Sequence, residues 1–157
     1  MYQFKEQLND GREGERRLDA FFAYWYTIAP ATDTQQRAGI DRIFTCLYFG
    51  QQFTVEYKTD KTAARTGNAF IETVSVTTTG KRGWAYTSTA EYLVYYVPGR
   101  EVAYIVPFEV IRAHLLRWLN TYQQRSVPNH GYCTEGVLVP LAELNRIATW
   151  YGTVDAA

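Results

Sequence analysis

The chain lacks the features that mark several specialised classes of protein. Its 157 residues include only two cysteines, Cys46 and Cys133, and Cys46 falls in an apolar run where a buried thiol is expected. No CxxC pair is present, which disfavours a closed zinc site with four ligands. No apolar run approaches the roughly 20 residues that cross a bilayer, and the opening segment MYQFKEQLND does not form a signal peptide. We therefore expect a cytoplasmic protein without a membrane segment.

The chain also lacks an excess of charge of either sign. Sixteen basic and sixteen acidic side chains leave a formal net charge of zero, so the composition as a whole does not indicate a nucleic-acid-binding protein. The basic residues are spread unevenly, however, and a local basic strip can contact phosphates even in a neutral chain. A solvated charged face fits the same pattern. The predicted DNA contacts within this strip are Lys61, Arg65, Asn68, Lys81 and Arg82.

The order of periodic segments predicts one α/β domain, residues 1–157, with a mixed central β-sheet flanked by helices. Apolar spacing predicts helices over residues 11–26, 108–125 and 141–148, and a short one that opens at Ser88 or Thr89. β-Branched and aromatic runs predict strands over residues 40–49, 52–58, 68–78 and 136–140, with two more that end near residues 98 and 107. Residues 31–39 and 126–136 are expected to form loops.

A charged pair stands out in the second strand of the predicted hairpin. Side chains alternate between the two faces of a strand, so Glu56 and Lys58 share one face. Asp41 begins the preceding strand. A two-residue turn at residues 50–51 would pair residue 41 with residue 60, which places Asp41 on that same face and within reach of Lys58. Contact between Asp41 and Glu56 would need a bulge or another register.

Two carboxylates from adjacent strands repel each other unless a cation lies between them, and Mg²⁺ prefers oxygen ligands. We therefore expect Asp41 and Glu56 to bind Mg²⁺, with Mn²⁺ able to substitute for it. Lys58 is expected to stabilise charge beside the nucleophile or the phosphate. The reaction that suits these groups is hydrolysis of a phosphodiester bond. The solvent face of an edge strand has the same charge alternation, so a purely structural role stays open.

The segments GID and VEYK, joined by a hairpin, resemble the PD-(D/E)XK nuclease superfamily. Asp41, Glu56 and Lys58 match its three motif positions, and Ile40 stands where the family usually has proline. The resemblance implies a restriction-endonuclease-like core in which these three residues are catalytic and the two acids bind the metal.

Two further segments extend this resemblance. The opening GREGERRLDAFF is similar to the first helix of Holliday-junction resolvases, which implies an additional metal ligand at Glu15 or, less well matched, at Glu13. Glu15 is also explained as an acid near the N-terminus of a helix. The segment TGNAFIE looks like one found in small phage-associated nuclease-like proteins, and Glu72 occupies its acidic position as a possible accessory residue.

Three functions stay open on this evidence. A Mg²⁺-dependent DNA endonuclease of the resolvase, restriction or homing type agrees best with the two acids and the lysine. A nuclease-derived module that binds DNA without cleaving it is the second. A domain that binds a small ligand or a partner chain is the third, and the neutral net charge favours it. Cleavage of both strands by so small a domain implies a homodimer or higher homo-oligomer.

Overall fold

The structure, a computed structural model, describes residues 2–154 as an alternation of helices and strands. The helices are α1 (Tyr2–Phe22), α2 (Asp33–Arg37), α3 (Thr62–Thr66), α4 (Trp84–Thr87), α5 (Phe108–Thr121) and α6 (Leu141–Ile147), with a 3₁₀ turn η1 (Pro98–Arg100). The strands are β1 (Tyr26–Pro30), β2 (Arg42–Cys46), β3 (Gln52–Thr59), β4 (Asn68–Val76), β5 (Lys81–Arg82), β6 (Tyr92–Val97), β7 (Val102–Pro107), β8 (Gln124–Pro128), β9 (Cys133–Pro140) and β10 (Trp150–Thr153). No helix in the described range is long and apolar enough to span a membrane.

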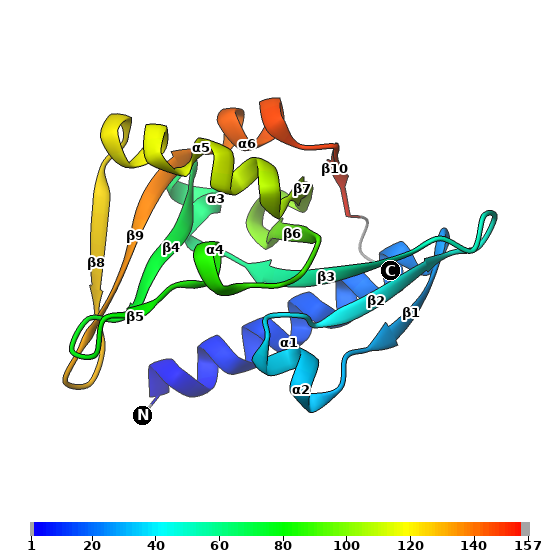
Figure 1. The fold of residues 1–157 in the computed structure, drawn as a ribbon, viewed down its shortest axis with the longest axis horizontal. Coiled ribbons are helices and arrows are strands. Elements are labelled where there is room, and N and C mark those ends of the chain that lie inside the picture. Colours follow the sequence, from blue (N-terminus) through cyan, green and yellow to red (C-terminus); the bar gives the residue numbers. More distant parts are fainter. Residues whose placement is uncertain (1, 155–157) are drawn as a thin grey trace.

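Six strands form a central sheet in the order β1-β2-β3-β6-β7-β10. Strands β3 and β6 run parallel, whereas the other neighbouring pairs are antiparallel. Helix α1 covers one face of this sheet, and α4, α5 and α6 lie on the other side (Figure 1). The predicted fold class, a mixed central sheet flanked by helices, is therefore confirmed.

Helix α1 lies directly on β3 because its apolar stripe and one glycine fit that strand. Leu18 and Phe22 are buried in a cluster with Val55 and other side chains of the sheet. A Cβ atom at Gly14 would come within 2.1 Å of the Thr59 hydroxyl oxygen, so the helix could not approach this closely with any other residue there. The odd-numbered residues of β3 therefore face α1, and the even-numbered ones face the opposite side of the sheet.

A second, antiparallel sheet has the order β5-β4-β9-β8. Ile71 and Val137 are fully buried on its inner side, in a core cluster with Trp118 of α5 and Val106 of β7. Its strands extend away from the body of the molecule at one end (Figure 1). Because only the short helix α3 separates β3 from β4, the end of the central strand β3 leads directly into this second sheet.

Several predicted boundaries were wrong for identifiable reasons. Ser88 ends helix α4 as its C-cap instead of opening a helix, because the helical turn begins earlier, after Gly83. The helix predicted to reach residue 125 ends at Thr121, and the strands β8 and β9 occupy most of the expected loop over residues 126–136. The loop expected over residues 31–39 contains the capped helix α2.

Candidate active site

The hairpin of β2 and β3 brings Asp41 level with Glu56, not with residue 60. Arg42 pairs with Val55, so the turn between the strands is longer than the predicted two residues. Asp41 lies one residue beyond this pair, and its N–H donates to the Val55 carbonyl at 2.8 Å. Its Oδ2 accepts a 2.7 Å hydrogen bond from the backbone N–H of Tyr57. The predicted register was wrong, and the observed one supplies the alternative register that contact between the two acids requires.

Glu56 stands out in this group because its charged side chain is almost fully buried. It is only 4% exposed, although carboxylates are rarely buried unless they are paired. Its Oε1 lies 2.6 Å from Nζ of Lys58, whereas its Oε2 is buried and has no hydrogen-bond partner within the described part of the chain. An unsatisfied buried polar atom costs about 1–3 kcal/mol. The ion pair with Lys58 therefore compensates one oxygen of Glu56 and leaves the other without a partner.

Two carboxyl groups near Lys58 have raised pKa values. Burial raises the pKa of Glu56, and the Lys58 ammonium opposes that shift without cancelling it. Burial likewise raises the pKa of Glu72, on β4, and Lys58 again opposes the shift. Glu72 accepts a 3.4 Å hydrogen bond from the N–H of Trp84, and Nζ of Lys58 lies 5.8 Å from the centre of the Trp84 indole. Lys58 thus interacts with carboxylates from both sheets.

Glu15 does not join this group. Its Oε2 forms a 3.1 Å ion pair with Arg42, and Arg42 also pairs with Asp19 at 3.0 Å. The hydroxyl of Tyr57 donates to the same Asp19 carboxylate. Because Tyr57 and Glu56 are successive residues of one strand, they point to opposite faces. The structure therefore brings Asp41, Glu56, Lys58 and Glu72 together and holds Glu15 on the α1 side of the sheet.

A cleft of about 460 Å³ opens beside Lys58 and Glu72, between β3 and the second sheet. Asn68 is the one predicted DNA contact that lines it. The other four predicted contacts are exposed on α3, just before it, or on β5: Lys61, Arg65, Lys81 and Arg82. Lys61 is ion-paired with Asp10 at 2.5 Å, whereas Arg65, Lys81 and Arg82 form no ion pair within residues 2–154.

Part of the cleft was missed from the sequence. Arg125, Asn129 and Thr134 line its wall, and all three fall where a helix end and a loop were predicted. The available signal was the two-residue period of Arg125, Val127 and Asn129, which is typical of a strand. The helical pattern that precedes it concealed this period.

The donor set at Asp41 and Glu56 fits a hard divalent cation that keeps most of its water. Glu56 offers the unpaired buried oxygen, and Asp41 uses only Oδ2 for its hydrogen bond to the strand. Between residues 2 and 154, no three or more carboxylate, histidine or cysteine side chains group together as a ready metal centre. Mg²⁺ does not need such a group, because it is commonly held by one or two carboxylates and several waters. Asp41 and Glu56 are compatible with that mode of binding.

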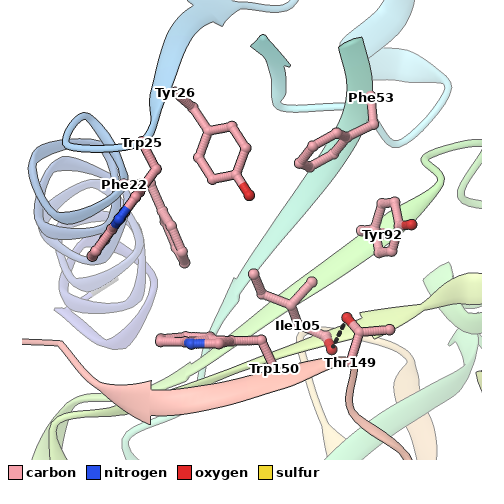
Figure 2. A pocket seen from close by; sticks show the side chains of 8 residues that line it. All are labelled: Phe22, Trp25, Tyr26, Phe53, Tyr92, Ile105, Thr149 and Trp150. Carbon is pink, nitrogen blue, oxygen red and sulfur yellow. Dashed lines mark hydrogen bonds between the residues drawn. The ribbon is translucent and has the colours of Figure 1, made fainter. Parts of the chain in front are cut away.

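A separate cavity of about 360 Å³ lies on the α1 side of the central sheet (Figure 2). Its aromatic lining residues are Phe22, Trp25, Tyr26, Phe53, Tyr92 and Trp150. Thr149 also borders it, but the hydroxyl of Thr149 donates to the Ile105 carbonyl (Figure 2). No carboxylate, lysine or histidine lines the cavity. This site can hold an apolar molecule, but it lacks the groups for acid, base or metal chemistry.

No family model matches the chain, and a search of curated proteins finds no match. Among solved structures, the chain is similar to a bacterial homing endonuclease, I-Ssp6803I, with 17% sequence identity and a TM-score of 0.48. The similarity covers 83% of this chain and 72% of that one. A likeness at this level carries no conclusion about activity, which depends on the side chains of this chain.

Proposed function

We propose that this chain is a Mg²⁺-dependent DNA endonuclease with Asp41, Glu56 and Lys58 as its catalytic residues. The observation that carries the proposal is the Glu56 carboxylate, which is buried level with Asp41, bound to Lys58 through one oxygen and unpaired at the other. Without a cation, this arrangement destabilises the folded protein. A cation held by both acids removes that destabilisation. Mn²⁺ should substitute for Mg²⁺, because carboxylate and water ligands suit both ions.

Each residue has a role that follows from its position. Asp41 and Glu56 would hold the cation, and the hydrogen bond from the Tyr57 N–H fixes the orientation of Asp41. When bound, Mg²⁺ would polarise a phosphoryl oxygen and lower the pKa of a coordinated water. Lys58 is one-third exposed toward the cleft and presents its ammonium to a non-bridging oxygen of the phosphate, where negative charge grows in the transition state.

Glu72 is the proposed accessory residue. It lies in the cleft beside Lys58, and its raised pKa lets it keep a proton at a higher pH than an ordinary carboxyl group does. Glu15 has a different proposed role, because it helps Asp19 to hold Arg42 on the far face of the sheet. Glu15→Gln should therefore leave cleavage within a few-fold of wild type, whereas a much larger loss would restore Glu15 as a metal ligand.

One proposed DNA contact, Asn68, lines the cleft, and the others lie on α3, just before it, or on β5. Arg65, Lys81 and Arg82 carry charges that no carboxylate pairs with in the described residues, so they can bind phosphates without first breaking an ion pair. Lys61 would have to release Asp10. Asn68 offers an amide at the cleft edge. Cleavage of both strands would require a homodimer, which sedimentation at several protein concentrations would detect.

The experiment is nicking of supercoiled plasmid with Mg²⁺, with Mn²⁺ and with EDTA. Wild type should cleave with either metal and not with EDTA. Asp41→Asn, Glu56→Gln and Lys58→Ala should each lower the rate by about 100-fold or more. Matched controls are Glu6→Gln and Lys5→Ala, which make the same chemical changes at exposed positions of α1 and should leave the rate unchanged. Cleavage retained in Lys58→Ala and Glu56→Gln would refute the assignment.

The aromatic cavity supports a second candidate function, binding of a small apolar ligand. Its volume of about 360 Å³ is within the usual range for small-molecule sites, and its lining is mostly aromatic. A protein with this function alone would show thermal stability that is insensitive to Mg²⁺ and to duplex DNA. A screen of aromatic fragments by thermal shift, with Trp150→Ala as the variant that opens the cavity wall, would identify such a ligand.

A further inference from the structure

We infer that the outward face of the second sheet reads base edges in the major groove of duplex DNA, an inference that rests on the proposed nuclease function. The side chains of this sheet that line the cleft alternate along each strand, so they belong to one face. They are Asn68, Phe70 and Glu72 on β4, Thr134 and Leu138 on β9, and Arg125, Val127 and Asn129 along and just beyond β8. We call this surface the reading face.

The reading face is continuous with the candidate active site. Glu72 of β4 pairs with Gly136 of β9, and Gly136 pairs in turn with Arg125 of β8. These residues therefore form one row across the sheet, in which Arg125 is about 10 Å from Glu72 because neighbouring strands are about 4.8 Å apart. Glu72 lines the cleft together with Lys58. A duplex held against Arg125 would thus also lie against the catalytic residues.

The distribution of unpaired cations favours an anionic ligand on this side of the molecule. Seven of the sixteen lysine and arginine side chains form ion pairs within residues 2–154: Arg16, Arg17, Arg42, Lys58, Lys61, Arg117 and Arg146. Three others, Arg37, Arg100 and Arg112, donate to backbone carbonyls. Of the remaining cations, Arg65, Lys81, Arg82 and Arg125 lie on or beside the second sheet, and only Lys5 and Arg12 lie elsewhere, on α1. Most of the cations without a partner in the described residues therefore belong to the second sheet and to α3 beside it, and Arg125 is the one of these four that lines the cleft.

The side chains of the reading face match the chemistry of base edges rather than that of phosphates alone. An exposed arginine such as Arg125 can bind guanine O6 and N7 together, and an asparagine such as Asn129 can bind adenine N6 and N7. Val127 and Leu138 are only partly buried and supply apolar contacts of the kind made with thymine methyl groups. A site for phosphate alone would need no such apolar residues.

The shape of the sheet also suits a groove. Strands β8 and β9 pair antiparallel from Gln124–Val137 to Pro128–Cys133, and β9 pairs with β4 on its other side, so β8 is the edge strand of a four-stranded sheet that extends from the body of the molecule (Figure 1). The major groove of B-DNA is about 12 Å wide and admits two strands, so the edge formed by β8 and its partner β9 can enter it. Phe70 packs against Gly136, where an added Cβ atom would lie 2.6 Å from the ring, so the Phe70 ring covers β9 at this point of the sheet.

The experiment is selection of bound duplexes from a library with a randomised window, in EDTA so that no cleavage occurs. Wild type should enrich a sequence motif. Arg125→Ala should lose the preference at one or two positions, which reduces discrimination there by about 5-fold to 100-fold, and should bind non-specific duplex nearly as well as wild type. Arg16→Ala is the matched control, because Arg16 is exposed but already paired with Glu13. It should select the wild-type motif.

An unchanged motif in both Arg125→Ala and Asn129→Ala, or no motif in wild type, would overturn the inference. Both residues are exposed, so their loss should not prevent folding, and circular dichroism would verify this. Plasmid nicking separates this failure from failure of the proposed function. Wild type that nicks plasmid but selects no motif refutes only the reading face. A motif that depends on Arg125, without metal-dependent nicking, supports the reading face and refutes the nuclease.

Discussion

Replacement of Glu56 by glutamine should stabilise the protein in the absence of divalent cations. The glutamate is 4% exposed and has one oxygen without a partner, so its charged form is poorly solvated in the folded state. A glutamine amide places a polar atom in the same position but carries no charge to desolvate, so the replacement should recover about 1–2 kcal/mol of stability. For a chain of this size, that corresponds to a rise in melting temperature of about 2–8 °C.

The difference in stability between wild type and Glu56→Gln should grow as pH rises. Burial raises the pKa of Glu56, so the unfolded state loses its proton before the folded state does as pH increases. Wild type and Glu56→Gln should therefore be equally stable below the ordinary carboxyl pKa. Wild type should then become less stable than Glu56→Gln as pH rises toward the raised pKa, and should remain less stable at neutral pH. Thermal unfolding of both proteins across this range measures the gap directly.

Mg²⁺ should close most or all of this gap in stability. If the dissociation constant is about 1 mM, then 10 mM Mg²⁺ would stabilise wild type by about 1.4 kcal/mol and leave Glu56→Gln nearly unchanged. Glu6→Gln, at an exposed position of α1, should behave as wild type under all conditions. The reasoning is refuted if Glu56→Gln melts below wild type at neutral pH without metal, or if Mg²⁺ shifts both melting temperatures equally.

Three other side chains give further predictions. Hydrogen bonds from Arg146, followed by those from Trp118 and Arg117, lower the pKa of Glu143 to about 2, so Glu143→Gln should lose on the order of 2 kcal/mol of stability at pH 7. That loss of stability should decrease as pH falls from the ordinary carboxyl pKa toward 2. A loss that stays constant in acid would contradict the explanation by the lowered pKa of Glu143. Arg42→Ala should cost about 1–3 kcal/mol in urea unfolding, because it removes the partner of Asp19. Glu72→Gln should slow cleavage by roughly 10-fold and flatten the alkaline side of its pH–rate profile, whereas an unchanged profile would leave Glu72 without a role in proton transfer.

The sequence predicted the shared face of the acidic residues better than it predicted their pairing. A change of hairpin register keeps each side chain on its face when strands slip by an even number of residues. The predicted pairing of residue 41 with 60 and the observed level of Asp41 with Glu56 differ by such an even step. The face was therefore predictable from alternation alone. The register depends on aromatic packing across the strands, where Phe44 pairs with Phe53 at a ring separation of 5.5 Å, and no local pattern specifies that choice.

The second sheet was not predictable for a related reason. Its strands β8 and β9 carry polar residues on their outer side, and β8 follows a strongly helical segment, so the local pattern resembled a helix end and a loop. What stabilises the sheet is non-local: Ile71 and Val137 pack with Trp118, which lies on another element of the chain. Helix α5 was predictable because its apolar stripe, with Ile111 and Leu115, repeats within a few residues.

The arrangement of charges separates two tasks that a DNA-cleaving domain must perform. Strand β3, in the centre of the larger sheet, holds Glu56 and Lys58 in one position, so these side chains would not move to suit different DNA sequences. The edge strand β8 carries the exposed Arg125, where substitutions would change the proposed recognition at little cost in stability. Glu72 and Trp84 connect the two regions, because both contact Lys58 or its surroundings from the side of the second sheet. In the proposed nuclease, specificity would therefore change along β8 and β9 while the proposed catalytic residues of β3 stay fixed.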